Sequence, residues 1–495
     1  MRWLGILGTL ALAAAGCGQN SPAEPATSTE SAAPARAEPA PEAPADAPQP
    51  PAMPAAEAAS PAAEKHAPGS LWTRKTGVDW PIFLGPTGDS KSTETGILTQ
   101  WPPEGLRIVW QRKLGEGYGI SSISQGRLFQ ADRIRDKARL VCLNAETGEE
   151  LWAHEYGTEY VDMYGYDGGP RCSPLVDGDR VYQYGAEGML HCLNALTGAE
   201  IWKVDVAKDF NVIQNFFGVG SNPVIVGDRL IVMVGGSPAD EAGLSVDRAS
   251  PNGTAIVTFN KFTGAVEYKL GDDLASYASL KLATIDNRPW CLAFCRAGLL
   301  GFDPTTGKQD FHFPWRAKSL ESVNASVPVV EGNEVFISET YGPGSAMVAV
   351  IPGDAREVWS DDPRKREKSL QTHWNTPVYV DGYLYASSGR HTENAELRCV
   401  EWKTGKVMWS VPGLTRCSLL YVDGHFVSQG EYGQLQLIKA NPEKYELVAE
   451  VLYRDGALPR PLLKYPAWAA PILSHGLLYV RGADRLVCLE LIPEK

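Results

Sequence analysis

Six residues that could bind a ligand occur at comparable places in a long repeat, each just ahead of a predicted strand. Arginine can hold a carboxylate through two parallel hydrogen bonds, asparagine can donate and accept, and tryptophan can stack on a planar ring. The six are Arg171, Asn222, Asn324, Asn375, Arg416 and Trp468. Around one opening they would suit a planar ligand bearing carboxylates. Alternatively, they satisfy strand ends and channel water.

Two further groups of residues are candidates for chemistry. Asp162 and Asp167 lie in the acidic loop 159–171 and offer the oxygen ligands that calcium prefers, although a solvated polar loop packed by its tyrosines is the favoured interpretation. His373 and His391 flank the first hairpin of the sixth repeat and could face the same opening. The sequence contains no zinc-protease helix motif, serine-hydrolase elbow or phosphate loop. No catalytic residue is therefore predicted.

The elements that must position these residues are set by an internal repeat, of which a first tight turn is the clearest mark. A glycine or asparagine is expected there because the backbone must take positive φ. The turn recurs eight times with a mean spacing of about 50 residues, as expected for a four-stranded propeller blade, at Gly126, Gly178, Gly227, Asn287, Gly332, Gly382, Gly424 and Gly476.

A second turn, usually Thr-Gly, precedes a large side chain by four residues. This position holds Trp152, Trp202, Tyr268, Phe311, Trp359, Trp409 and, in the irregular seventh unit, Val448. A planar side chain here would fill the wedge between neighbouring blades. The eighth unit lacks a final strand, whereas Trp110 lies in a final strand that no unit precedes.

These observations predict an all-β chain. The fold expected over residues 106–495 is an eight-bladed β-propeller of four-stranded antiparallel blades, closed by an N-terminal strand that joins the last blade. Such closure removes two exposed sheet edges. A lead-in segment, 69–105, comes before the propeller.

The repeat resembles a known family. The sequences LNAETGEELW (residues 143–152) and LNALTGAEIW (residues 193–202) are similar to the tryptophan-docking repeat of pyrroloquinoline-quinone-like propellers, and residues 80–102 resemble the start of such proteins. The family includes quinoprotein dehydrogenases and non-enzymatic outer-membrane assembly-factor B (BamB)-like lipoproteins. The resemblance implies the ring, whereas the cofactor depends on residues outside the repeat.

Resemblance to the dehydrogenases would imply pyrroloquinoline quinone with calcium, an aspartate base and a disulfide between adjacent cysteines, but the sequence has no Cys-Cys pair. The function expected is a non-catalytic binding or scaffolding module. The alternative is a pyrroloquinoline-quinone-dependent dehydrogenase that oxidises an alcohol, sugar or polymer. The partners expected are envelope proteins or a small polar ligand at the channel mouth.

The N-terminus indicates export and a lipid anchor. Residues 1–16 have one early charge and a short apolar run, as in a signal peptide. Cys17 follows Ala-Ala-Gly and resembles a lipidation site. Residues 17–68 form the lipidated cysteine and a tether; positions 19–68 hold 18 Ala and 12 Pro, too few large apolar residues for a core. We expect a monomeric, membrane-anchored lipoprotein facing the periplasm, with the outer membrane favoured because Gly18 is not Asp.

Charge and cysteine content limit the remaining functions. Asp and Glu outnumber Lys and Arg by 59 to 46, which argues against a nucleic-acid partner because phosphate binding needs basic residues in excess. Eight cysteines follow Cys17, and four of them hold equivalent repeat positions in different blades. Those four should be too far apart to bridge, so we expect free, buried thiols.

Overall fold

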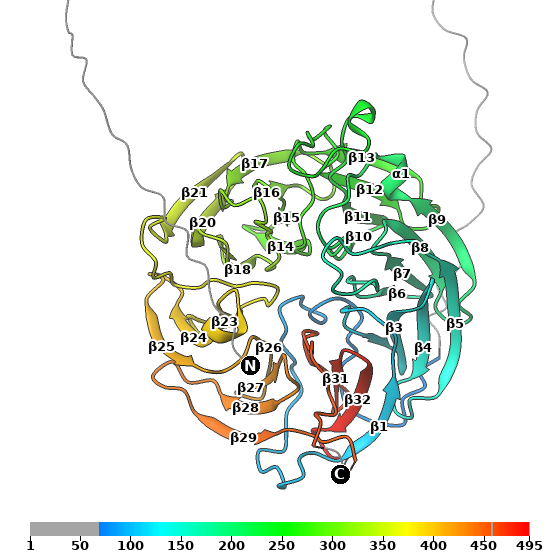
Figure 1. Cartoon of the computed structure of the whole chain (residues 1–495), viewed down its shortest axis with the longest axis vertical. Helices are drawn as coiled ribbons and strands as arrows, with labels where there is room; N and C mark the ends of the chain where they lie inside the picture. Colours follow the sequence, from blue (N-terminus) through cyan, green and yellow to red (C-terminus); the bar gives the residue numbers. More distant parts are fainter. Residues whose placement is uncertain (1–68, 457–458, 495) are drawn as a thin grey trace, which may run out of the picture. The chain divides into compact units, whose positions relative to one another are not determined.

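The computed structural model describes residues 69–456 and 459–494. In that part of the chain, 32 strands form eight four-stranded antiparallel sheets arranged in a ring (Figure 1), whose centre we call the channel. The predicted eight-bladed β-propeller is confirmed. The predicted signal peptide, the tether and Cys17 lie outside the described residues.

Each blade runs from a short strand at the channel to a strand at the outer rim. Blade 1 contains β2 (Ser122–Ser124), β3 (Arg127–Ile134), β4 (Lys137–Asn144) and β5 (Glu150–Gly157). Blade 2 contains β6 (Leu175–Asp177), β7 (Arg180–Tyr184), β8 (Met189–Asn194) and β9 (Glu200–Asp205). Blade 3 contains β10 (Val224–Val226), β11 (Arg229–Met233), β12 (Ile256–Asn260) and β13 (Val266–Leu270). Blade 4 contains β14 (Lys281–Ile285), β15 (Arg288–Phe294), β16 (Gly298–Phe302) and β17 (Gln309–Pro314).

The second half of the ring repeats this order. Blade 5 contains β18 (Val329–Glu331), β19 (Glu334–Glu339), β20 (Gly344–Ile351) and β21 (Asp354–Ser360). Blade 6 contains β22 (Val378–Val380), β23 (Tyr383–Ser388), β24 (Glu396–Glu401) and β25 (Val407–Pro412). Blade 7 contains β26 (Cys417–Val422), β27 (His425–Gly430), β28 (Leu435–Lys439) and β29 (Leu447–Val451). Blade 8 contains β30 (Ile472–Ser474), β31 (Leu477–Gly482), β32 (Arg485–Glu490) and β1 (Ile108–Lys113).

Within residues 69–456 and 459–494, helical structure is confined to short connections. These are α1 (Val206–Asp209) and the 3-10 turns η1 (Ala239–Glu241) and η2 (Thr392–Asn394). Among the described residues, no helix combines the length and the apolar character needed to cross a membrane.

The first hairpin turn of each blade has the backbone that the sequence predicts. Gln125 and Gly126 have φ of 52° and 72°, the left-handed pair of a two-residue hairpin turn. Asp286 and Asn287 adopt the same conformation in blade 4, at 51° and 60°. Asparagine can replace glycine there because its short polar side chain tolerates left-handed backbone.

Ring closure occurs where the unpaired N-terminal strand predicted it. Strand β1 pairs antiparallel with β32, with Trp110 opposite Cys488. The indole Nε1 of Trp110 then donates to the Ala145 carbonyl of blade 1 at 2.9 Å. The first and last blades are thereby joined both by a sheet and by a side-chain contact.

The same docking contact recurs around the ring. Trp152, Trp202, Trp359 and Trp409 each donate from Nε1 to a carbonyl of the following blade, at 2.9–3.2 Å. A Cβ on Gly198 would lie 2.5 Å from the Trp152 ring, and one on Gly264 would lie 2.9 Å from the Trp202 ring. The Thr-Gly turn therefore keeps glycine so that the indole of the preceding blade can lie against the backbone.

The lead-in segment crosses the channel, which the repeat did not predict. Trp80 forms a β-bridge with Ile123 of blade 1, and the Val176 amide of blade 2 donates to the Pro81 carbonyl at 2.9 Å. Further along, the Ser90 hydroxyl donates to the Leu419 carbonyl of blade 7 at 2.6 Å. Residues 80–91 thus lie against the innermost strands on both sides of the ring.

Candidate functional site

A central cavity of about 660 Å³ lies at the end of the channel where the chain enters the innermost strands. Phe83, Leu84 and Ser90 of the lead-in segment also line it, and the contacts of Trp80, Pro81 and Ser90 with the inner strands place this segment at its floor. This volume is within the ~300–1,000 Å³ typical of ligand sites. The propeller therefore presents a cup rather than an open pore.

The structure gathers most of the predicted ring. Arg171, Asn222, Asn375, Arg416 and Trp468 line the cavity together with Ile120, and so do His373 and His391. Asn324 does not line it, although its neighbours Val323 and Ala325 do. The buried Asn324 amide instead donates to the carbonyls of Cys295 at 2.7 Å and Trp315 at 3.2 Å, because its side chain turns toward blade 4.

Arg416 is neutralised from within the protein. Its Nε and Nη2 both reach Oε2 of the fully buried Glu431, at 3.0 and 2.6 Å. The Trp468 indole and the Thr392 hydroxyl also donate to this carboxylate, at 3.1 and 2.8 Å. Burial raises the pKa of Glu431, but hydrogen bonds from Arg416, Trp468 and Thr392 hold it below its ordinary value. The guanidinium lies 4.4 Å from the Trp374 ring.

Arg171 is satisfied in a similar way by the acidic loop. It forms an ion pair with the buried Asp162 and donates to the Asp167 carbonyl at 2.7 Å. Asp162 also accepts from the Tyr164 amide, and Asp167 accepts from the amides of Gly169 and Gly117. Both carboxylates that could have held a hard cation are therefore occupied in shaping the loop.

Of the two cavity asparagines, Asn222 connects neighbouring blades, whereas Asn375 bonds within its own blade. Asn222 accepts from the Ser173 amide at 2.6 Å and donates to the Ser279 hydroxyl at 2.8 Å. Asn375 donates to the Ser387 carbonyl at 2.9 Å. These bonds support the interpretation that the asparagines satisfy strand ends.

Sequence reasoning missed Arg390, which also lines the cavity. Its guanidinium lies 4.4 Å over the Tyr341 ring, and among the described residues no carboxylate forms an ion pair with it. Arg390 follows β23 in a loop outside the repeat, so no periodic signal marks it. It is the cavity arginine whose charge is left for a ligand.

His373 lies between Tyr341 and Arg416. Its Nε2 is 3.1 Å from the Tyr341 hydroxyl and its Nδ1 is 3.5 Å from Nη1 of Arg416. Burial, together with Arg416, Arg390 and His391, lowers the pKa of His373 to about 3. The imidazole is therefore neutral at physiological pH and adds no charge to the cavity.

Aromatic side chains dominate the rest of the wall. Eleven line the cavity: Phe83, Tyr118, Tyr164, Tyr166, Phe216, Phe217, Tyr277, Tyr341, Trp374, Tyr465 and Trp468. We call Tyr164, Tyr166, Phe216 and Phe217 the aromatic rim. The centroids of the contacting rings lie 5.7–6.5 Å apart. Tyr166 is 62% exposed and Tyr164 is 51% exposed. The rim therefore offers apolar surface to a partner.

The lining residues do not fit pyrroloquinoline quinone with calcium. Two of the arginines expected to hold its carboxylates are already paired with Glu431 and Asp162. The carboxylates that line the cavity, Glu321 and Glu393, are exposed at the surface. Within the described chain, no group of three His, Cys, Asp or Glu side chains in the cavity is close enough to hold an ion.

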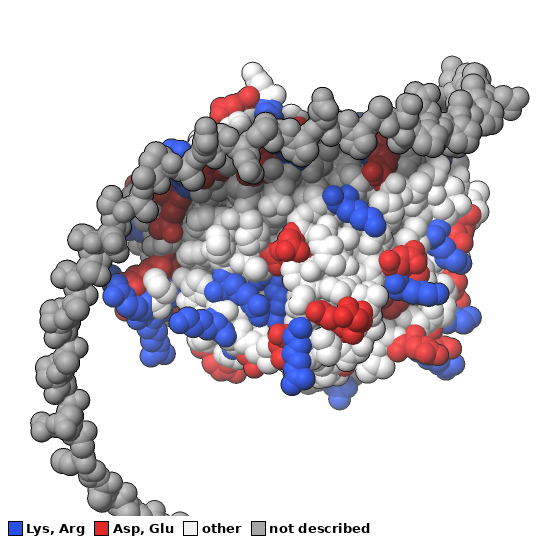
Figure 2. All heavy atoms as spheres, turned by 90° about the horizontal axis from the view of Figure 1, so that it is seen from above, with Lys and Arg blue, Asp and Glu red and all other residues white. Residues whose placement is uncertain are grey.

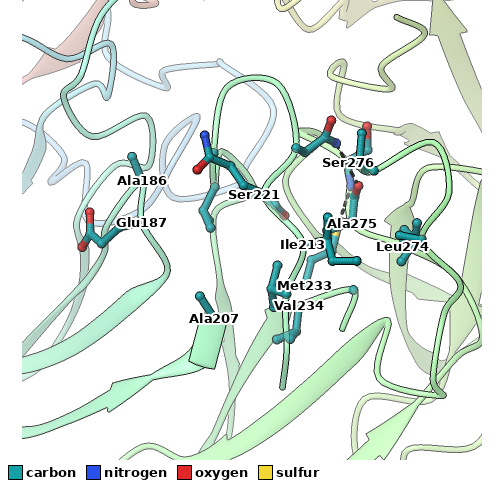
Figure 3. A pocket seen from close by; sticks show the side chains of 18 residues that line it. Ala186, Glu187, Ala207, Ile213, Ser221, Met233, Val234, Leu274, Ala275 and Ser276 are labelled. Atoms are coloured by element: carbon teal, nitrogen blue, oxygen red, sulfur yellow. Dashed lines mark hydrogen bonds between the residues drawn. The ribbon is translucent and has the colours of Figure 1, made fainter. Parts of the chain in front are cut away.

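A second cavity lies beside blades 2 and 3 (Figure 3). At about 70 Å³ it is far smaller than a cofactor site. Glu187 at its edge accepts from the Tyr156 hydroxyl at 2.8 Å.

The cysteine prediction is also confirmed, because all eight cysteines in the described residues are free and buried.

Comparisons with known proteins agree with the propeller fold. Residues 102–163 and 252–441, just over half of the chain, match the family model described as outer membrane protein assembly factor BamB. No curated protein sequence matches the chain.

Solved structures share the fold at low sequence identity. BamB from Moraxella catarrhalis is 15% identical with a TM-score of 0.52, covering 79% of this chain and 99% of its own. Quinohemoprotein alcohol dehydrogenase from Comamonas testosteroni is 12% identical with a TM-score of 0.57; the match covers 84% of this chain and 82% of the dehydrogenase. The computationally designed Ika8 protein is 11% identical with a TM-score of 0.50; the match covers 78% of this chain and 100% of Ika8. From the family match, this chain belongs to the family of the outer membrane protein assembly factor BamB.

Proposed function

We propose that this chain is a non-catalytic binding module of the cell envelope that holds polypeptide partners at the mouth of its central cavity. The observation that carries the proposal is the pairing of Arg416 with Glu431 and of Arg171 with Asp162. These pairs leave an aromatic cup with one uncommitted arginine, Arg390, in place of an anion clamp. The family description, outer membrane protein assembly factor, supports a protein partner.

The surface at the mouth suits a polypeptide better than a small polar ligand. Val161, Met163, Tyr164 and Tyr166 of one loop are each at least 51% exposed. Contiguous exposed apolar surface commonly marks a protein-binding site. Figure 2 shows the side of the propeller, where basic and acidic side chains are interspersed with uncharged surface, so this side has no strongly charged patch that would compete with the mouth for a charged partner.

Export and anchoring complete the proposal. Residues 1–16 would be removed as a signal peptide, Cys17 would carry the lipid, and residues 17–68 would hold the propeller away from the membrane, facing the periplasm. Two or more acyl chains are enough for stable anchoring. The outer membrane is favoured.

A labelled peptide tests the proposal. Strands of outer-membrane barrels alternate apolar and polar residues and carry aromatic girdles, so the probe is a ten-residue peptide of alternating aromatic and polar residues. We expect saturable micromolar binding by fluorescence anisotropy, about tenfold weaker for Tyr166→Ala, since exposed aromatics are frequent hot spots.

The control is Val266→Ala, which removes a side chain of similar exposure, 45%, from β13 on the outer rim of blade 3. This variant should bind as the unmodified chain does. Equal weakening by both substitutions, or absence of saturable binding, would contradict binding at the cavity mouth.

A further inference from the structure

Three side chains that could ligate a metal meet between the outer parts of blades 1 and 2. In β5, Trp152, His154 and Tyr156 are partly buried, whereas the residues between them are exposed. Because successive side chains of a strand point to opposite faces, His154 faces the same way as Trp152, whose indole donates to the Ala195 carbonyl of blade 2. His154 therefore faces blade 2.

Blade 2 supplies the other two side chains. His191 lies on β8 and is 2% exposed, and Glu200 begins β9 with a side chain that is 33% exposed. The candidate ligand atoms of His154, His191 and Glu200 all lie within 4.8 Å of one another. Nδ1 of His191 is 3.4 Å from Oε2 of Glu200.

Three of the four histidine nitrogens in this cluster have no hydrogen-bond partner among the residues that the structure describes. Nε2 of His154 and both ring nitrogens of His191 are buried without one, since the 3.4 Å approach of Glu200 does not have hydrogen-bond geometry. Unpaired buried polar atoms are rare and costly. The cluster thus holds polar ring atoms that no described residue satisfies.

The repeat does not require histidine at this place. His191 precedes Cys192, which pairs with the docking residue Trp202. The equivalent residues are valine in blades 1, 3 and 8 (Val141, Val257 and Val487), Leu300 and Ala346 in blades 4 and 5, and Arg398 and Gln436 in blades 6 and 7. The two polar residues have carboxylate partners, Glu396 and Glu450, which His191 lacks at hydrogen-bond geometry. A valine would pack there without leaving a polar atom unpaired. The imidazole is therefore a departure that packing alone does not explain.

We propose that His154, His191 and Glu200 bind a divalent transition-metal ion of the zinc class between blades 1 and 2. Two imidazole nitrogens and one carboxylate oxygen are common ligands of zinc, which takes four in a tetrahedron. Water would occupy the remaining position. Because the ligands come from both blades, the ion would clip their outer strands together beside the Trp152 contact.

One local cation competes for the carboxylate. Lys203 lies 3.2 Å from Oε1 of Glu200. Its side chain is 55% exposed, so it can withdraw into water when the ion binds. Glu200 therefore exchanges a surface ion pair, which contributes little to stability, for a metal bond.

Metal titration of the purified full chain, without an affinity tag and after treatment with chelator, tests the proposal. With Zn²⁺ as the calorimetric probe we expect one equivalent to bind. With Co²⁺ as the spectroscopic probe we expect the intense visible absorption of a tetrahedral site. His191→Val, which installs the residue of blades 1, 3 and 8, should weaken binding at least 100-fold, and Glu200→Gln at least tenfold.

The matched control is Glu155→Gln, because Glu155 follows His154 but faces outward and pairs with Lys137 at 3.4 Å. This variant should bind the ion as the unmodified chain does. Circular dichroism should show that all variants fold; if His191→Val does not, Glu200→Gln gives the result alone. The proposal is overturned if no equivalent binds, or if Glu200→Gln and any folded His191→Val bind as tightly as the control.

Discussion

The carboxylate of Glu431 receives the guanidinium of Arg416 in a buried, two-pronged contact, with Nη2 at 2.6 Å and Nε at 3.0 Å from the same oxygen. The Trp468 indole donates to that oxygen as well. Two of the residues predicted to hold a ligand are therefore tied to each other through a third. This relationship joins two residues of the cavity wall and neutralises one cation at the mouth.

Loss of this carboxylate should be costly. Glu431→Ala leaves the Arg416 charge buried without its partner, and such a change destabilises by about 3–5 kcal/mol. Denaturant unfolding followed by tryptophan fluorescence measures it. In contrast, Glu155→Ala breaks the exposed pair with Lys137 and should cost under about 1 kcal/mol. Equal costs for the two substitutions would contradict the assigned burial of the Arg416 pair.

The docking contact that closes the ring can be tested at a glycine. Gly148 has φ of 72°, and a Cβ there would lie 2.7 Å from the Trp110 ring. Gly148→Ala therefore combines left-handed strain of about 1–2 kcal/mol with displacement of the indole.

Gly178→Ala is the matched control, because Gly178 has φ of 61° but no atom within 4 Å of its Cβ position. We expect Gly148→Ala to lower the free energy of unfolding by at least about 1 kcal/mol more than Gly178→Ala does. Chemical denaturation measures both. Equal losses would mean that the Trp110 contact does not hold the ring closed.

The free energy of unfolding should fall as pH rises from about 4.3 to about 7, the range between the unfolded and folded pKa of Glu339. Burial raises the pKa of this carboxyl to about 7, whereas the unfolded chain titrates near its ordinary value of about 4.3. Between these pH values the folded protein binds a proton that the unfolded chain does not, so folding is favoured below the window and weakened above it.

Glu339→Gln should remove this slope and stabilise the protein at pH 8, by up to roughly 3 kcal/mol since each pKa unit corresponds to about 1.4 kcal/mol. The amide oxygen can still accept from the Tyr341 amide, which lies 2.6 Å from the carboxylate. Unfolding curves at pH 5 and pH 8 give the comparison. An unchanged slope in the variant would show that another group titrates.

The anchor makes a prediction outside the described residues. Cys17→Ser removes the proposed lipid attachment, so the protein should move from the membrane to the soluble envelope fraction. The unmodified chain should resist extraction by high salt, because acyl chains and not charges hold it. Membrane association of the Cys17→Ser protein would refute the lipid assignment.

Most of the fold could be predicted from the sequence because the ring is built from a repeat. The position of Trp110 in an unpaired final strand was enough to predict its pairing with β32. The path of residues 80–91 across the channel was not predictable, since it depends on single contacts such as Ser90 with Leu419. Such contacts have no period in the sequence.

The site was predictable in position but not in chemistry. Arg416 and Glu431 lie together because the β26–β27 hairpin pairs Cys417 with Gly430, so a correct register would have predicted their contact. The pairing of Arg171 with Asp162 depends on the conformation of a loop, which no alternation pattern determines. Residue type alone therefore suggested free arginines where the folded chain has ion pairs.

The central claim is that the cavity mouth binds polypeptide and does not bind a catalytic quinone. The direct measurement is calorimetric titration of the full chain with the alternating aromatic peptide, repeated in the presence of pyrroloquinoline quinone and calcium. We predict saturable micromolar peptide binding that the quinone leaves unchanged. Micromolar quinone binding with dye-linked alcohol oxidation that Arg171→Ala abolishes would contradict the account.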